Sequence, residues 1–182
     1  MNKKSLDRKA AKQFILDNRA ISKTDQEIYN ELSQQYYDKK AIALLVTSTV
    51  TMENKKKYKI YNNGLIGLIG ITVLFKIFII VNLALVVNQV WYLLLAFLVP
   101  IFNIYFLYEI AKYNGSIYRI LGIWVIGFSL QSINKVEGTN LIVNLILCIL
   151  IAGLAFYLDR NMFPNYSPNN FKKDSNGEYI LS

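Results

Sequence analysis

The chain has no histidine, one cysteine, and only 12 acidic residues against 20 basic ones. Histidine is the usual general base near neutral pH and the commonest metal ligand, so Ser–His catalysis is excluded. Because Cys148 is the single cysteine, an intramolecular disulfide and a multi-cysteine metal site are excluded. Cys148 lies within a long apolar run, so a reactive thiol is not expected. Neither a phosphate-binding glycine loop nor carboxylates at catalytic spacing are present. The sequence therefore predicts a protein that is not an enzyme and that uses no metal and no cofactor.

The hydrophobic residues, 54% of the chain, are concentrated in residues 64–158. Residues 1–63 carry 13 of the 20 Lys and Arg, and the net charge is +8. Such a charge could indicate nucleic acid, but basic flanks beside apolar spans are better explained by the anionic cytoplasmic leaflet. We predict a basic cytoplasmic helical region (1–63), a membrane region (64–158) and a polar cytoplasmic tail (159–182), with the lipid bilayer as partner and no nucleic acid.

The apolar region is long enough for four membrane spans. A transmembrane helix needs about 20 apolar residues. The connections between the candidates are short, so neighbouring helices are expected to run antiparallel. The predicted fold class is all-α, a four-span transmembrane helical bundle preceded by short cytoplasmic helices. The predicted spans are 64–87, 90–110, 117–134 and 140–158.

Basic residues mark one side of the predicted spans. The turn at residues 88–89 contains no Lys or Arg, and the loop at 135–139 has only Lys135. The positive-inside rule therefore places both termini in the cytoplasm, in a multi-pass protein of the plasma (inner) membrane. The basic residues near the predicted cytoplasmic ends are Lys55, Lys56, Lys57, Lys59, Lys112, Arg119, Arg160, Lys172 and Lys173.

The region before the first span has the pattern of short helices. "TDQE", from Thr24 to Glu27, is a capping box that predicts a helix start. Three or four helices of this size would share only a small core. In the tail, "DSNGEYI" could form a turn with a short strand, although its neighbouring prolines and asparagines favour a flexible or surface-lying end. The predicted apolar stripes are Leu6, Ala10 and Phe14; Ile28, Leu32 and Tyr36; and Ala41, Leu44, Leu45 and Ser48.

Two stretches carry a resemblance to small uncharacterised bacterial multi-pass membrane proteins with an N-terminal helical segment. The first, "TDQEIYNELSQQYYDKKAIALLVTSTVTMENKKKYKIY", resembles a segment with an E-I-Y start, an apolar helix and a K-x-x-x-Y close, but lacks that segment's middle tryptophan. "PIFNIYFLYEIAK" is similar to a P-x-x-N-x-Y run in such proteins. Together they cover about a quarter of the chain and imply no activity. The matching positions of the first stretch are Glu27, Ile28, Tyr29, Leu32, Leu44, Lys55 and Tyr58.

Three residues make a candidate intramembrane polar site. Lys76 lies near the middle of the first span, where a lysine costs about 2.5–3.5 kcal/mol to insert. Pro100 should kink the second span, and Asn103, one turn on, should lie at the depth that the Lys76 ammonium reaches. The alternative is that the Lys76 stem extends toward the cytoplasm and has no function. Glu109 is expected at the end of its helix, paired with Lys112 or Arg119.

The fourth span carries a stripe of small or polar residues every four positions, namely Asn140, Asn144, Cys148 and Ala152. Such stripes let helices approach closely in lipid, so Asn144, Cys148 and Ala152 are predicted to pack against another helix. The spacing of Gly64, Gly67 and Gly70 in the first span also suggests close packing.

Two functions fit these features. The first is a non-catalytic membrane protein that acts by binding a protein partner, as an accessory subunit or an immunity-type protein. The second is a small channel or transporter around Lys76 and Asn103, which would need a homo-oligomer because four spans are few for a transporter.

Overall fold

The computed structural model describes residues 4–87, 90–132, 139–167 and 171–181. These residues form eight helices and one two-stranded sheet, so the predicted predominance of helix is confirmed. The chain divides into a terminal unit (residues 1–56 and 160–182) and an apolar unit (residues 57–159). The elements are α1 (Arg8–Ala20), α2 (Asp25–Gln35), α3 (Lys39–Ser48), α4 (Met52–Lys57), α5 (Lys59–Val87), α6 (Val90–Ala111), α7 (Gly115–Ser132), α8 (Thr139–Met162), β1 (Lys172–Lys173) and β2 (Tyr179–Ile180).

Side-chain caps start the three helices of the terminal unit. The Asp7 carboxylate accepts a hydrogen bond from the Lys9 amide at 3.0 Å and starts α1. The predicted capping box of α2 is confirmed: the Thr24 hydroxyl accepts from the Glu27 amide, and the Glu27 carboxylate accepts from the Thr24 amide at 2.8 Å. The Asp38 carboxylate starts α3 by accepting a hydrogen bond from the Ala41 amide. Each cap satisfies amides that have no partner inside the helix.

The core of the terminal unit lies between α1, α2 and α3. The predicted face of α2 is confirmed at Ile28 and Leu32, which are fully buried. The other two stripes are correct only in part: Leu6, Phe14 and Leu45 are half-buried against this core, but the fully buried residues are others. Leu6 precedes α1, whose buried face centres on Ile15, and α3 buries Ile42 and Val46. The apolar run in α3 offers more than one candidate face, and the buried one carries its β-branched side chains Ile42, Val46 and Thr47.

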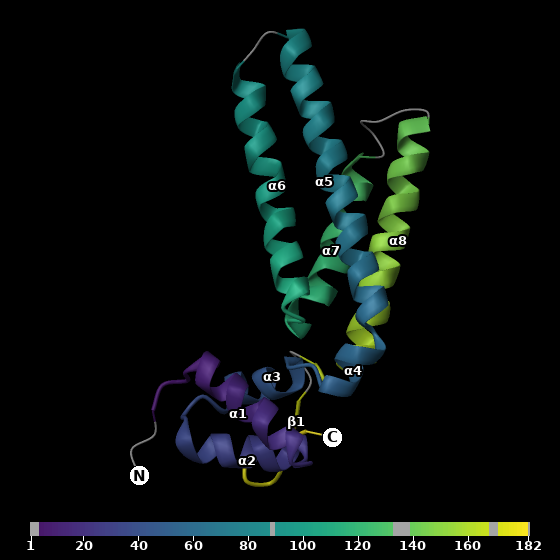
Figure 1. Cartoon of the computed structure of the whole chain (residues 1–182). Helices are drawn as coiled ribbons and strands as arrows, with labels where there is room; N and C mark the ends of the chain where they lie inside the picture. Colours follow the sequence, from purple (N-terminus) through teal and green to yellow (C-terminus); the bar gives the residue numbers. More distant parts are fainter. Residues whose placement is uncertain (1–3, 88–89, 133–138, 168–170, 182) are drawn as a thin grey trace. The chain divides into compact units, whose positions relative to one another are not determined.

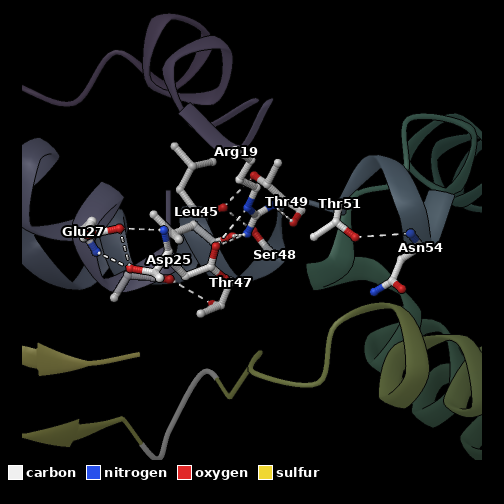
Figure 2. A network of polar contacts seen from close by, with 12 residues as sticks. Arg19, Asp25, Glu27, Leu45, Thr47, Ser48, Thr49, Thr51 and Asn54 are labelled. Carbon is white, nitrogen blue, oxygen red and sulfur yellow. Dashed lines mark hydrogen bonds and ion pairs between the residues drawn. The ribbon is translucent and has the colours of Figure 1, made fainter. Parts of the chain in front are cut away.

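Arg19 connects three helices of this unit (Figure 2). Its guanidinium donates to the Thr49 carbonyl at 2.6 Å and the Val46 carbonyl at 3.0 Å, at the end of α3. It also pairs with Asp25, the first residue of α2, at 2.8 Å. The arginine thus satisfies carbonyls that the end of α3 leaves open, while Asp25 balances its charge.

The tail folds back as a hairpin, so the turn with a short strand is confirmed, and its strands lie at the surface, as the surface-lying alternative expects. Lys172 pairs with Ile180 and Lys173 with Tyr179 in antiparallel register. Asp174 starts the turn, where its carboxylate accepts from the Glu178 amide at 2.8 Å. Gly177 has a φ of +76°, a conformation that side chains rarely adopt.

Side chains of α2 and α3 hold the hairpin. The Gln26 amide donates to the Tyr179 carbonyl at 3.1 Å and accepts from the Leu181 amide at 2.7 Å, so it pairs with β2 as a neighbouring strand would. Leu181 is buried in the same core as Ile28. The N-terminal region and the tail, which the sequence analysis treats as separate, therefore share one core.

Glu178 adds a polar contact to the same junction. Its carboxylate accepts from the Tyr29 hydroxyl at 2.9 Å and forms an ion pair with Lys39. The Tyr29 ring is fully buried and meets the Tyr179 ring edge to face, with centroids 6.3 Å apart. The small hydrophobic core is thus completed by residues from the other end of the chain.

The apolar unit consists of α5 to α8, and Figure 1 shows α5 and α6 side by side. Helix α5 begins five residues before the predicted span and α8 ends four residues after it. Apolar composition marks the lipid-soluble length of a helix, whereas backbone hydrogen bonding continues into polar flanks. The predicted connections at 88–89 and 135–138 lie outside the described residues.

Two segments of the described chain are long and apolar enough to cross a membrane, Lys59–Phe78 and Leu141–Met162. The described apolar segments of the other two helices are shorter, Ile101–Ala111 and Gly115–Leu130. The four-span arrangement predicted from the sequence is therefore not confirmed, because two helices in the described residues are long and apolar enough to cross a membrane.

Buried polar contacts join the helices of the apolar unit. The Asn62 amide of α5 donates to the Ile110 carbonyl of α6 at 3.3 Å and accepts from the Tyr118 hydroxyl of α7 at 2.7 Å. Arg119 of α7 pairs with Asp159 of α8 at 2.9 Å. The expected pairing of Glu109 with Lys112 or Arg119 is wrong: Glu109 accepts from the Asn114 side chain at 2.6 Å.

Candidate functional site

A cavity of about 620 Å³ lies among the four helices of the apolar unit. Most of its wall is apolar, and all four helices contribute to it. A cavity of this kind with a few convergent polar groups is the default candidate for a binding site. The lining residues are Ile69, Thr72, Phe75 and Lys76 of α5; Phe102 and Asn103 of α6; Leu121, Trp124, Val125, Phe128 and Ser129 of α7; and Asn144, Leu147, Cys148 and Ile151 of α8.

The structure brings Lys76 and Asn103 to the same cavity, from α5 and α6. Their equal depth was expected from counting residues away from the turn between these helices. Thr72, one turn before Lys76, donates its hydroxyl to the Ile69 carbonyl at 2.7 Å. Asn144 of α8 and Ser129 of α7 place two further polar groups in the wall. One cationic group and four neutral polar side chains thus share an otherwise apolar space.

No acidic residue described in the apolar unit forms an ion pair with Lys76. Its described acidic residues are Glu109 and Asp159. Asp159 pairs with Arg119, and Glu109 binds the Asn114 amide. Lys76 takes part in none of the four ion pairs that the described residues form. The cavity therefore contains a positive charge that no carboxylate of the described chain neutralises.

Pro100 does not interrupt α6, which runs as one helix from Val90 to Ala111. Its side chain lies outside the described residues, as does that of Asn140, so the predicted kink and the first position of the α8 stripe stay predictions. Only Lys76 and Asn103 of the three predicted polar-site residues are placed at the cavity.

The α8 stripe serves two surroundings. Cys148 and Ala152 are buried, and the Cys148 thiol donates to the Val125 carbonyl of α7 at 3.7 Å. Asn144 and Cys148 also line the cavity. The stripe thus lies where α8 faces α7. Its N-terminal residues, Asn144 and Cys148, line the cavity, so the stripe is not packed against a helix along its whole length.

Glycine packing differs from the expectation for α5. A Cβ added to Gly64 would lie 4.0 Å from Leu154, whereas a Cβ added to Gly67 or Gly70 would meet no neighbouring side chain or helix within 4 Å among the described residues. The closest approach is at Gly122 of α7, where a Cβ would lie 2.7 Å from the Phe156 ring of α8. Close helix contact therefore depends on Gly122, which the sequence analysis did not single out.

The α7 residues of the cavity were also missed. Leu121, Trp124, Val125 and Phe128 follow the i, i+3, i+4, i+7 spacing of one helix face, with Ser129 adjoining it. The Trp124 ring lies 4.7 Å from that of Phe128 and 5.9 Å from that of Phe102, between centroids. This spacing was visible in the sequence, but in a helix that is apolar on every side it does not distinguish a cavity from lipid.

A second hollow, of about 550 Å³, belongs to the terminal unit. It is lined by polar side chains of α2, including Gln26, Asn30 and Gln34, and by the hairpin residues Asp174 and Glu178. Burial raises the pKa of Tyr29 to about 12, and the hydrogen bond from Lys39 lowers the pKa of Glu178. Both shifts stabilise the protonation states that hold the hairpin at neutral pH.

The described residues contain no group of three or more His, Cys, Asp or Glu that could hold a metal ion. No protein-family model, no curated protein and no solved structure matches this chain. The cavity and the hollow are therefore interpreted from their own chemistry.

Proposed function

We propose that this chain is a non-catalytic multi-pass membrane protein whose apolar unit binds a ligand beside Lys76, as the subunit of a small oligomeric transporter or channel. The single observation that carries the proposal is the convergence of Lys76 and Asn103, from two helices, on one cavity. Intramembrane ionisable residues are costly, and they usually face a bundle interior or a water-filled space that a solute uses.

The exposed surface of the apolar unit supports the proposal that its four helices cross a bilayer. Ile71, Ile123 and Ile149, from three helices, are 59%, 61% and 69% exposed. Helix α6 has 22 residues and α7 has 18, lengths of about 33 Å and 27 Å at 1.5 Å per residue. Exposed apolar surface of this extent is unfavourable in water and favourable in lipid. Basic residues beside the predicted cytoplasmic ends support cytoplasmic termini in a plasma membrane.

The transport proposal is tested in liposomes that contain the purified protein and a trapped anion. Efflux of chloride and of naphthalenesulfonate is measured for the wild type, Lys76→Met and Lys76→Arg. We expect efflux above that of protein-free liposomes, its loss in Lys76→Met, and its retention in Lys76→Arg, which keeps the charge. Wild-type efflux no faster than from protein-free liposomes would contradict transport.

Partner binding remains a second candidate because the terminal unit presents its own hollow. Asn30 and Gln34 of α2 lie beside the hairpin residues there, and polar grooves on folded modules are common recognition surfaces. A photo-crosslinking residue in place of Asn30 should capture one discrete protein in cells, whereas the same residue in place of Lys9, exposed on α1, should not. Equal capture at both positions would remove support for this candidate.

A further inference from the structure

We propose that the cavity of the apolar unit binds an anion that carries an apolar body, with the negative group at Lys76. This inference rests on the proposed function and names the chemical class of its ligand. The wall divides into a polar part, made by the Lys76 ammonium with the Asn103 and Asn144 amides, and an apolar part, made by aromatic rings and aliphatic side chains.

The charge determines the sign of the ligand. Lys76 is a cation, and the acidic residues described in its unit already bind other groups. An ammonium in low-dielectric surroundings attracts an anion more strongly than it would in water. Asparagine amides donate hydrogen bonds to carboxylate, sulfonate or phosphate oxygens. A cationic ligand would be repelled, and a neutral one would leave the ammonium without a counter-charge.

The walls determine the rest of the ligand. Phe75, Phe102, Trp124 and Phe128 contribute rings, and those of Trp124 and Phe128 lie 4.7 Å apart. Aromatic surfaces bind acyl chains and flat rings through burial and stacking. The volume of about 620 Å³ is in the range of pockets that take drug-sized molecules. A small inorganic ion would leave most of this apolar space unfilled, so an anion with an apolar body fits better.

Binding is measured with two fluorescent probes that differ only in charge, dansyl sulfonate and its neutral sulfonamide. The full-length protein is placed in phosphatidylcholine nanodiscs whose scaffold protein contains no tryptophan. The chain has two tryptophans, so Trp91→Phe leaves Trp124 at the cavity as the single energy donor. Energy transfer from Trp124 then reports a probe bound beside it. We expect the sulfonate to bind at least about tenfold more tightly than the sulfonamide.

Variants of Lys76 assign that preference to the cavity. Lys76→Met in the same background should bind the two probes equally, and Lys76→Arg should keep the preference for the sulfonate. The same preference for the sulfonate in Lys76→Met, or no preference in the wild type, would overturn the inference. Should Lys76→Met fail to fold, Lys76→Gln, which also removes the charge, replaces it, and an unchanged preference for the sulfonate in Lys76→Gln would overturn the inference.

The source of the anion is distinguished by lipid composition. If phosphatidylglycerol occupies the cavity, adding this lipid to the nanodiscs should weaken sulfonate binding to the wild type and leave Lys76→Met unchanged. Unchanged sulfonate binding would assign the site to a free anion instead; either result keeps an apolar-bodied anion at Lys76. Because no flux is measured, selective binding without efflux would refute transport alone, and efflux without selective binding would refute only this inference.

Discussion

The terminal unit and the apolar unit differ in how much of their apolar surface is exposed. Ile15 and Ile28 of the terminal unit have no exposed surface, whereas Ile123 and Ile149 of the apolar unit are 61% and 69% exposed. The terminal unit has one-sided helices with side-chain caps, and the apolar unit has helices that are hydrophobic on every side. A helix hydrophobic all round requires an apolar environment. This contrast supports the proposal that the two units are built for different solvents, water for the terminal unit and lipid for the apolar unit.

Shortening a buried and an exposed isoleucine gives the largest predicted contrast. Ile15→Ala removes fully buried methyl groups, so the free energy of unfolding of the terminal unit should fall by about 2–5 kcal/mol. Ile149→Ala should leave the protein folded with little change. Urea unfolding in nanodiscs, followed by hydrogen exchange in α2 and α8, measures both. Equal losses for the two variants would contradict the assignment of separate solvents.

An arginine placed on the exposed surface of each unit tests whether that surface faces lipid or water. Ile149→Arg should cost about 2.5–3.5 kcal/mol in membrane insertion if α8 faces lipid. Ile21 at the end of α1 is equally exposed, at 68%, and Ile21→Arg should be tolerated because water solvates the new charge. A glycosylation-based insertion assay gives the cost for α8, and thermal unfolding gives that for α1. Normal insertion of Ile149→Arg would argue against lipid around α8.

Removing a buried hydroxyl should have a smaller effect. In Tyr118→Phe the side-chain oxygen of Asn62 loses the hydrogen bond from the Tyr118 hydroxyl. The free energy of unfolding of the apolar unit should fall by about 1 kcal/mol, since hydrogen bonds inside membrane proteins contribute modestly. Thermal denaturation in detergent should show a lower midpoint. Tyr105→Phe is the matched control, because Tyr105 is 53% exposed and its midpoint should not move.

The smallest predicted effect is the pH dependence of the hairpin in the terminal unit. The pKa of Glu178 is lowered from 4.5, so its stabilisation is present above that value and is lost as the pH falls below it. The pKa of Tyr29 is raised from 10.0 to about 12, so its contribution is complete below pH 10 and is lost as the pH rises toward 12. The acidic limb should be worth under about 1 kcal/mol, because the Lys39–Glu178 pair is partly exposed.

Urea midpoints at acidic, neutral and alkaline pH measure these two limbs. Glu178→Gln should flatten the acidic limb alone, and Tyr29→Phe the alkaline limb alone. A full acidic limb in Glu178→Gln would assign that titration to another carboxylate.

Local signals in the sequence were sufficient for part of the structure. The capping box at Thr24 depends on residues three positions apart, so it was predicted correctly. The convergence of Lys76 and Asn103 followed from the rise of two helices joined by a short turn. Each case uses only distances along neighbouring elements, which the sequence determines directly.

Contacts between distant segments were not predictable in this way. Gln26 and Leu181 meet across 155 positions, and no periodicity connects them. The Asn62–Tyr118 hydrogen bond depends on how α5 and α7 are rotated, which uniformly apolar helices leave open. The buried face of α3 was misplaced for a related reason, because apolar residues occupy several of its sides.

The most direct test uses the single cysteine, since Cys148 lines the cavity that contains Lys76. Its modification rate is measured in proteoliposomes with anionic sulfonatoethyl and cationic trimethylammonioethyl methanethiosulfonate, with Cys148→Ala as the unlabelled control. Each rate is divided by the rate of the same reagent with a small free thiol. The account predicts that this relative rate is higher for the anionic reagent in the wild type and that the preference is lost in Lys76→Met. The same charge preference with and without Lys76 would contradict a cavity governed by this lysine.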